Sequence, residues 1–287
     1  MPAIDENTTA ALRYPAARRS PGLARASDSL GPLADLLGTW VGTKGVNMVT
    51  FPFPSQGEAA STPLVREYLE TITFSPIGAD VPNRRAGGID YVAGVMYQLF
   101  SSDIATNQPM HVENGMWLML DQATKRSSVA RLASVPHGDS VLAIGDWGKV
   151  EGGPIYPPIR ALPGDRGPAR PRKYPKMKTG QFDPNKPEAT LESEIAGQDV
   201  LHTTYISVST FGGGGVLNTP LLDRKASTIQ FDCLLWVETI RDAANPGRTF
   251  QLLQYAQTST IEFPDDPKAP SRRFRSPHVN LNTLVKQ

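Results

Sequence analysis

The chain has 287 residues, with 29 Lys and Arg against 28 Asp and Glu, 39% hydrophobic residues and a single cysteine, Cys233. The balanced charge gives no electrostatic reason to expect nucleic acid or an anionic membrane as a partner. One cysteine excludes an internal disulfide framework and a cysteine-based zinc cluster. The 25 Gly and 26 Pro residues favour a β-rich domain with many turns and long loops, and we expect a cytoplasmic protein.

The first 29 residues show neither strand alternation nor a sustained helical stripe, so we expect a flexible N-terminal tail over residues 1–29. No apolar run in this region is long enough for the core of a signal peptide. The sequence also lacks a stretch of about 18 apolar residues, the length that a membrane-spanning helix needs. We expect a single domain from residue 30 to residue 287.

A short helix is predicted before the first strand, because Leu33, Leu36 and Leu37 have helical spacing and Trp40 then follows between glycines. Residues 66–77 alternate regularly and form the clearest predicted strand. One face of this strand would carry Tyr68, Glu70, Ile72 and Phe74. Turn residues separate seven further strand candidates, at 90–101, 110–121, 127–134, 140–147, 202–210, 227–241 and 249–263. This succession, with little helix, predicts an up-and-down antiparallel β-barrel or a β-sandwich.

Residues 152–197 interrupt the strand pattern with nine prolines and interleaved Lys and Arg. Because proline cannot donate to a strand ladder, this segment is not a central strand. We expect a long excursion from the barrel, either as a lid or as a disordered insertion. The basic run 166–178 has an alternative interpretation as a nucleic-acid arm, but a solvated loop is preferred because the rest of the chain supplies no basic face.

The four histidines are His111, His137, His202 and His278. None belongs to an HExxH motif, and the sequence has no GxSxG elbow and no glycine-rich phosphate loop. His111 lies directly after a turn at the start of an apolar strand, and His278 follows Pro277. Taken alone, each of these two is more readily explained as a structural or surface histidine, and Cys233 as a buried structural thiol.

Residues 38–45, Gly-Thr-Trp-Val-Gly-Thr-Lys-Gly, resemble the GxWxGxG signature of the nitrobindins, small haem-binding β-barrels related in shape to lipocalins and fatty-acid-binding proteins. Three further segments are similar to that family and follow in the expected order: REYLETITFSPIG at 66–78, QPMHVENG at 108–115, and a closing part with LLQYAQTST and SPHVNLNTLVKQ. The resemblance implies an all-β fold, an antiparallel up-and-down barrel of about ten strands with a short N-terminal helix and long loop insertions.

The resemblance also implies a site. In nitrobindins the closing histidine ligates the iron, which makes His278 the expected metal ligand and haem b the expected cofactor. His111 corresponds to the histidine on the opposite side of the haem and is the expected catalytic residue. The other expected haem contacts are Met110, Thr50, Trp40 and Gly42. Nitrobindins bind nitric oxide and convert peroxynitrite to nitrate, so an isomerase acting on a small or diatomic ligand is implied.

The chain departs from the shorter family pattern by its tail, an insertion around 84–99, the proline-rich segment and an extension at 265–276. The extension offers Arg272, Arg273 or Arg275 to haem propionates. The added loops suggest a more enclosed pocket and an organic substrate with peroxidase-like chemistry. Two alternatives stay open: a haem-free carrier of an apolar small molecule, and a haem carrier or gas sensor without turnover. A homodimer is also open, since barrels of this family often pair but no exposed apolar stripe is legible.

Overall fold

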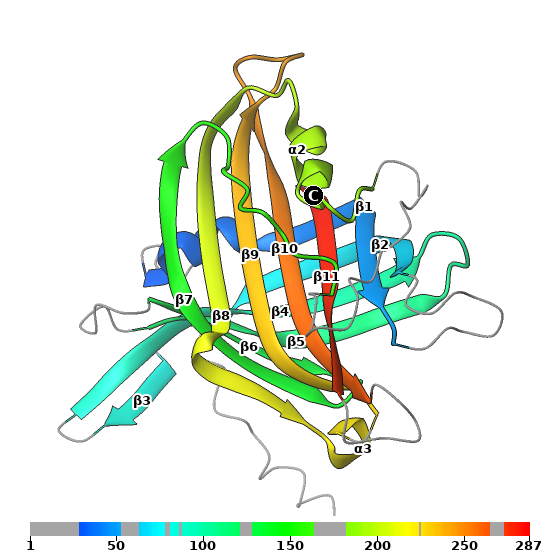
Figure 1. The fold of residues 1–287 in the computed structure, drawn as a ribbon. Helices are drawn as coiled ribbons and strands as arrows, with labels where there is room; N and C mark the ends of the chain where they lie inside the picture. The colour runs from blue at the N-terminus through cyan, green and yellow to red at the C-terminus, as the bar shows by residue number, and fades with distance from the viewer. Residues whose placement is uncertain are drawn as a thin grey trace, which may run out of the picture.

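The protein closes into a ten-stranded antiparallel β-barrel (Figure 1). The computed structural model describes residues 29–52, 63–77, 81–85, 88–120, 128–163, 182–223, 225–264 and 273–287. In this part of the chain the strands follow one another around the ring in sequence order, and pairing of β2 with β4 and of β1 with β11 closes it. An up-and-down barrel, rather than a sandwich, is therefore the architecture that the strand pattern encodes.

Eleven strands and three short helices are described. The strands are β1 (Gly38–Thr50), β2 (Pro63–Pro76), β3 (Val81–Arg85), β4 (Gly88–Asp103), β5 (Pro109–Met119), β6 (Val129–Val135), β7 (Asp139–Glu151), β8 (Val200–Asn218), β9 (Ser227–Arg241), β10 (Thr249–Pro264) and β11 (Arg273–Lys286). The helices are the 3-10 helix η2 (Gly31–Leu36), α2 (Ala189–Ile195) and α3 (Pro220–Asp223). None of these helices has the length and apolar character needed to cross a membrane.

The predicted strands are confirmed, with different ends in most cases. Strand β9 matches its predicted range residue for residue, whereas β8 continues to Asn218, beyond the predicted end at Thr210. The predicted insertion around 84–99 is not a loop, because β3 pairs with the first residues of β4 as an antiparallel hairpin. Figure 1 shows this hairpin projecting away from the barrel. The remainder of β4 then joins the ring between β2 and β5.

The barrel core follows from the alternation in β2, whose inward face carries Tyr68, Glu70, Ile72 and Phe74, all buried as predicted. One end of the barrel is closed by η2, a 3-10 helix at the position of the predicted short helix. Leu33 and Leu36 of this helix are fully buried beside Trp40. The indole nitrogen of Trp40 donates a hydrogen bond to the carbonyl oxygen of Leu36 at 2.7 Å, which ties the helix to the first strand.

The described ends of the proline-rich segment lie against the outer wall of the barrel. No strand occurs in residues 152–163 or 182–199, as the prolines predict. Leu191 of α2 is buried in an apolar cluster with residues on the outer faces of β1, β9, β10 and β11. The ring of Tyr156 packs edge-on against Trp236, with 5.0 Å between the ring centroids. These two ends do not form a lid over the barrel mouth. Residues 164–181 lie outside the described residues.

Two further predictions, on the N-terminal tail and on the arginines near haem propionates, can be compared with the described residues. Nearly all of the predicted N-terminal tail, residues 1–28, lies outside them. Arg275, expected near haem propionates, instead forms an ion pair with Glu262 at 2.7 Å. Arg273 lies 4.0 Å from the same carboxylate, and Arg272 is outside the described part of the chain.

Candidate functional site: a histidine-lined barrel cavity

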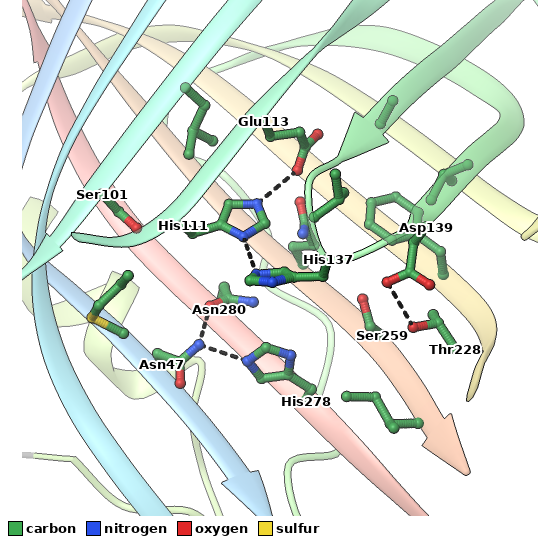
Figure 2. Close-up of a pocket in the computed structure, with 18 of the residues that line it drawn as sticks. Asn47, Ser101, His111, Glu113, His137, Asp139, Thr228, Ser259, His278 and Asn280 are labelled. Atoms are coloured by element: carbon green, nitrogen blue, oxygen red, sulfur yellow. Dashed lines mark hydrogen bonds and ion pairs between the residues drawn. The ribbon is translucent and has the colours of Figure 1, made fainter. Parts of the chain in front are cut away.

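A cavity of about 260 Å³ lies inside the barrel, and every strand of the ring except β8 contributes to its wall. Three of the four histidines line this cavity: His111, His137 and His278 (Figure 2). The fourth, His202, lies on β8 and is not among the lining residues. Side chains far apart in the sequence are thus brought to one place by closure of the ring.

His278 projects from β11 into the cavity as a neutral imidazole. The amide nitrogen of Asn47, on the neighbouring strand β1, donates hydrogen bonds of 2.6 Å to Nε2 of His278 and to the side-chain oxygen of Asn280. Because an amide nitrogen only donates, Nε2 of His278 carries a lone pair and Nδ1 carries the ring proton. Burial, with a smaller contribution from positive charge on His111 and His137, lowers the pKa of His278 to about 4.

His111 and His137 face each other across 3.4 Å, measured from Nδ1 of His111 to Nε2 of His137. His111 lies near the start of β5, and His137 lies in the turn between β6 and β7, where Gly138 has a φ of 107°. A turn with that backbone angle favours glycine. Burial lowers the pKa of His137, the charge of His111 adds to this effect, and Asp139 opposes it.

Glu113 supports His111 from the same face of β5. Its Oε2 lies 3.2 Å from Nε2 of His111, and its Oε1 lies 2.6 Å from a terminal nitrogen of Arg131. The hydroxyl of Tyr97 also donates to Oε1. Burial would raise the pKa of Glu113, but the charge of Arg131 and the hydrogen bonds from His111 and Tyr97 outweigh it and lower the pKa to about 2. Glu113 is therefore ionised although it is fully enclosed.

The second buried carboxyl group at the cavity, Glu70, has a different environment. The hydroxyl of Tyr255 lies 2.8 and 2.9 Å from its two oxygens, and the amide of Asn282 donates at 2.9 Å. All of these hydrogen-bond partners are neutral, whereas Glu113 has Arg131. Burial raises the pKa of Glu70 to about 7, although the hydrogen bonds from Asn282 and Tyr255 oppose the rise. Glu70 can thus gain or lose a proton near neutral pH.

The structure places the residues expected from the sequence in two groups. Met110, His111 and His278 line the cavity, whereas Trp40, Gly42 and Thr50 do not. Trp40 is barrel core beneath η2. A Cβ atom at Gly42 would lie 2.8 Å from the side chain of Asn282, so the glycine permits close strand packing. Thr50 is buried at the end of β1, and its hydroxyl has no hydrogen-bond partner among the described residues.

The residues that the sequence did not reveal are Asn47, Glu113, Arg131 and His137. Asn47 faces inward because the pairing register of β1 with β2 shifts between Gly42 and Gly45. A bulge of this kind changes which side chains point to the core. A signal for Glu113 was present, since alternation puts it on the face of His111. Arg131 was visible only as a charged residue within an apolar strand.

The fold and this cavity define a β-barrel with an internal cavity lined by strands of the ring. Residues 29–152 match the family model described as a THAP4-like, heme-binding beta-barrel domain. The matched part is the N-terminal part of the barrel, which is similar to this family of haem-binding β-barrels. The matching segment contains His111, Glu113, Arg131 and His137, and it ends before His278.

Among solved structures, the chain is similar to the one titled "Crystal Structure of Rv2717c from M. tuberculosis", with 14% sequence identity and a TM-score of 0.40. That comparison covers 91% of this chain and 97% of the other. No curated protein matches the sequence.

The donor chemistry of the cavity fits a haem. A haem iron requires an axial ligand from the protein, and a neutral imidazole is a common one. His278 presents such an imidazole at the cavity wall, with an unprotonated Nε2. The apolar part of the wall, which includes Met110, Leu222 and Ile261, suits the face of a porphyrin.

Proposed function

We propose that this protein binds haem in the barrel cavity, with Nε2 of His278 as the iron ligand and His111 on the side where a small ligand binds. The observation that carries the proposal is the cavity-facing imidazole of His278, whose low pKa keeps it neutral across the physiological range. The family description supports the cofactor class. The lone pair of Nε2 faces the amide of Asn47, so Asn47 would turn away when the ligand bond forms.

The haem would be of the b type, held without covalent bonds to the chain. Covalent attachment in c-type proteins uses two cysteines in a CxxCH motif, and this chain has only Cys233. Cys233 is buried inside the barrel, where burial raises the pKa of its thiol to about 11. A protonated, enclosed thiol is a poor nucleophile and a poor metal ligand.

The bound haem would supply an iron with one open axial position for nitric oxide, peroxynitrite or a peroxide. The chain's own contribution would be to orient the haem through His278, to cover its apolar face, and to hold a proton at His111. A small ligand is favoured over an organic one, because the described ends of the proline-rich segment do not line the cavity. The activity would then be isomerase-like, with peroxidase-like turnover as the second assay.

The experiment is a titration of the purified protein with ferric haem, followed by absorption spectroscopy. The native protein should give a saturable Soret band, and His278→Ala should shift or abolish it. His202→Ala is the matched control, because His202 lies outside the cavity. No Soret band in the native protein would overturn the proposal and favour a haem-free carrier of an apolar molecule. Haem binding without peroxynitrite or peroxide turnover would favour a haem carrier or gas sensor.

A further inference from the structure

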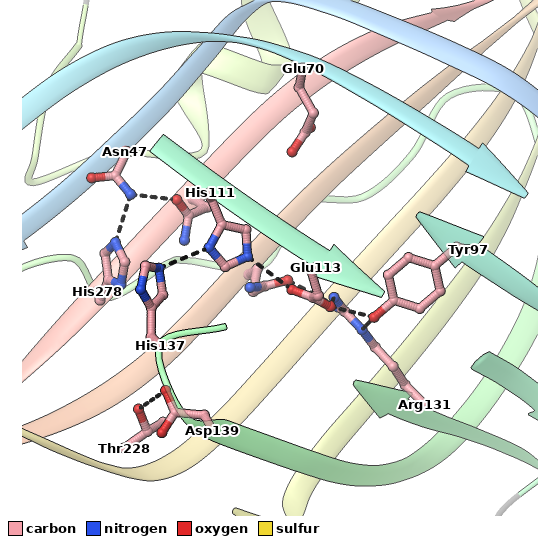
Figure 3. Close-up of polar contacts among 12 residues, drawn as sticks. Asn47, Glu70, Tyr97, His111, Glu113, Arg131, His137, Asp139, Thr228 and His278 are labelled. Atoms are coloured by element: carbon pink, nitrogen blue, oxygen red, sulfur yellow. Dashed lines mark hydrogen bonds and ion pairs between the residues drawn. The ribbon is translucent and has the colours of Figure 1, made fainter. Parts of the chain in front are cut away.

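A chain of polar contacts runs from the barrel interior to the cavity face, in the order Arg131, Glu113, His111 and His137 (Figure 3). Its inner end is the guanidinium of Arg131, which is almost completely buried. Nε of Arg131 donates to the hydroxyl of Tyr97 at 3.2 Å. One terminal nitrogen donates to Gln257 at 3.0 Å and the other to Glu113 at 2.6 Å.

Aromatic rings complete the enclosure of Arg131. Its central carbon lies 4.9 Å from the ring centroid of Phe231, 5.3 Å from that of Trp117 and 5.5 Å from that of Tyr97. A guanidinium does not lose its proton in a protein, so it offers only donors. It therefore fixes Glu113 as a carboxylate, which accepts hydrogen bonds at both oxygens and donates none.

The state of Glu113 determines the tautomer of His111. Nε2 of His111 lies 3.2 Å from a carboxylate oxygen that accepts only, so Nε2 carries the proton. In the neutral ring the lone pair is then on Nδ1, the atom that faces His137. Arg131 and Glu113, neither of which carries out chemistry, thereby determine which atom of His111 points along the cavity face.

The geometry between the two imidazoles points to one shared proton. Two lone pairs 3.4 Å apart would repel, and two N–H groups would collide, so a single proton lies between Nδ1 of His111 and Nε2 of His137. The separation exceeds the 2.7–3.2 Å of ordinary N–H hydrogen bonds. The hydrogen bond between the two rings is therefore weak, and a ligand with a better acceptor atom can replace the acceptor nitrogen. His137 is exposed, so water can restore the proton afterwards.

We propose that Arg131 and Glu113 are positioning residues that fix the Nε2–H tautomer of His111, and that His111 and His137 hold one shared proton for a ligand in the cavity. In the transfer the pair starts in its singly charged imidazolium form: an N–H bond breaks as an O–H bond forms on the ligand, which leaves both rings neutral, and a hydronium ion from solvent re-forms the N–H bond. The tautomer part depends on the chain alone, whereas delivery to an iron-bound ligand rests on the proposed function.

The test is the ¹⁵N NMR spectrum of the histidine rings in the haem-free protein. His111 should show a protonated, pyrrole-type Nε2 and an unprotonated, pyridine-type Nδ1. In Glu113→Gln the amide oxygen should stay with Arg131, which only donates, so the NH₂ group faces His111. The tautomer should then reverse to Nδ1–H. Glu262→Gln is the matched control and should leave the His111 signals unchanged, because Glu262 pairs with Arg275 and does not line the cavity.

An Nδ1–H tautomer of His111 in the native protein would overturn the proposal, and this readout needs no variant to fold. An unchanged tautomer in a folded Glu113→Gln protein would overturn it as well. Haem binding is measured separately by the Soret titration. A normal Soret band with the wrong tautomer would reject only the present inference, and the right tautomer without a Soret band would reject only the proposed function.

Discussion

The histidines of the cavity differ in what their ring nitrogens meet. His278 faces an amide that only donates, and His111 faces a carboxylate that only accepts. The first arrangement leaves Nε2 free of a proton, and the second places a proton on Nε2. Under the proposed function, residues of the same type would thus have different tasks, His278 as a donor to iron and His111 as a holder of a proton.

The pKa of His278 gives a prediction for stability. Its value falls from 6.5 to about 4 on folding, so the unfolded chain binds more protons between these two pH values. The free energy of unfolding of the haem-free protein should therefore decrease as the pH falls from about 6.5 to 4. His278→Gln should remove this part of the pH dependence. Urea unfolding of both proteins across that range is the measurement, and identical pH profiles would contradict the assignment.

Glu70 gives a prediction of opposite sign. Its pKa rises from 4.5 to about 7 on folding, so the folded chain binds more protons between those values. Stability is present below about pH 4.5 and is lost as the pH rises through 7. The rise corresponds to about 3 kcal/mol of penalty for the buried charge. Glu70→Gln should unfold at a higher urea concentration than the native protein at pH 8 and show a smaller difference at pH 5.

Single residues were predictable where one strand determined their direction. The shared face of Tyr68, Glu70, Ile72 and Phe74 in β2 follows from alternation within that strand. Met110, His111 and His278 could be placed only by their resemblance to a family pattern. Trp40, Gly42 and Thr50, expected as haem contacts, are not among the residues that line the cavity. Asn47 lines it because it lies after the register shift in β1 and faces inward. A bulge depends on the pairing of two strands and leaves no clear periodic signal in either one.

At the scale of elements, β5 and β6 carry a buried ion pair between Glu113 and Arg131. Arg131→Met should destabilise the protein by about 3–5 kcal/mol, because it leaves Glu113 buried without its counter-charge. The double variant Glu113→Leu with Arg131→Met should recover much of this loss, since neither charge is then buried. Urea unfolding of the single and double variants measures the coupling. A double variant less stable than both single variants would contradict this account of the pair.

Most strands could be predicted from the sequence, because apolar and polar residues alternate within each strand. The sequence predicts a strand at 90–101, within β4, but it gives no sign of β3, which pairs with the first residues of β4 outside the ring. The prolines of 152–197 predicted the absence of a strand, but they carried no information on which surface the segment contacts. That depends on Trp236, Val279 and Leu281, outward-facing residues of the barrel wall that the segment covers.

For the whole molecule, closure of the ring creates features that no linear pattern contains. One is an exposed apolar row in direct register across four strands, made of Met96, Met116, Leu132 and Leu142. The sequence shows no such stripe because the four residues lie on different strands. The cavity is another, since its lining comes from nine strands of the ring. Whether the protein forms a homodimer stays a prediction, which sedimentation analysis would test.

The described ends of the proline-rich segment pack on the outer wall of the barrel, so we predict that loosening them leaves the cavity unchanged. Leu191→Ala should loosen α2 from the barrel wall, because truncation of a buried leucine costs about 2–5 kcal/mol. Proteolysis near residues 182–197 should become faster, while the haem spectrum stays unchanged. Phe211→Ala is the control, since Phe211 is 88% exposed. A change in the Soret band of Leu191→Ala without faster cleavage would contradict the separation.

The most direct test of the account is chemical rescue of the iron ligand. His278→Gly, loaded with ferric haem, should lack the native Soret band and, after reduction, the iron–histidine vibration. Free imidazole, which fills the space left by the side chain, should restore both signals. The native protein should show the iron–histidine vibration without added imidazole. A glycine variant that keeps the native spectrum without imidazole would show that another group ligates the iron and would contradict the account.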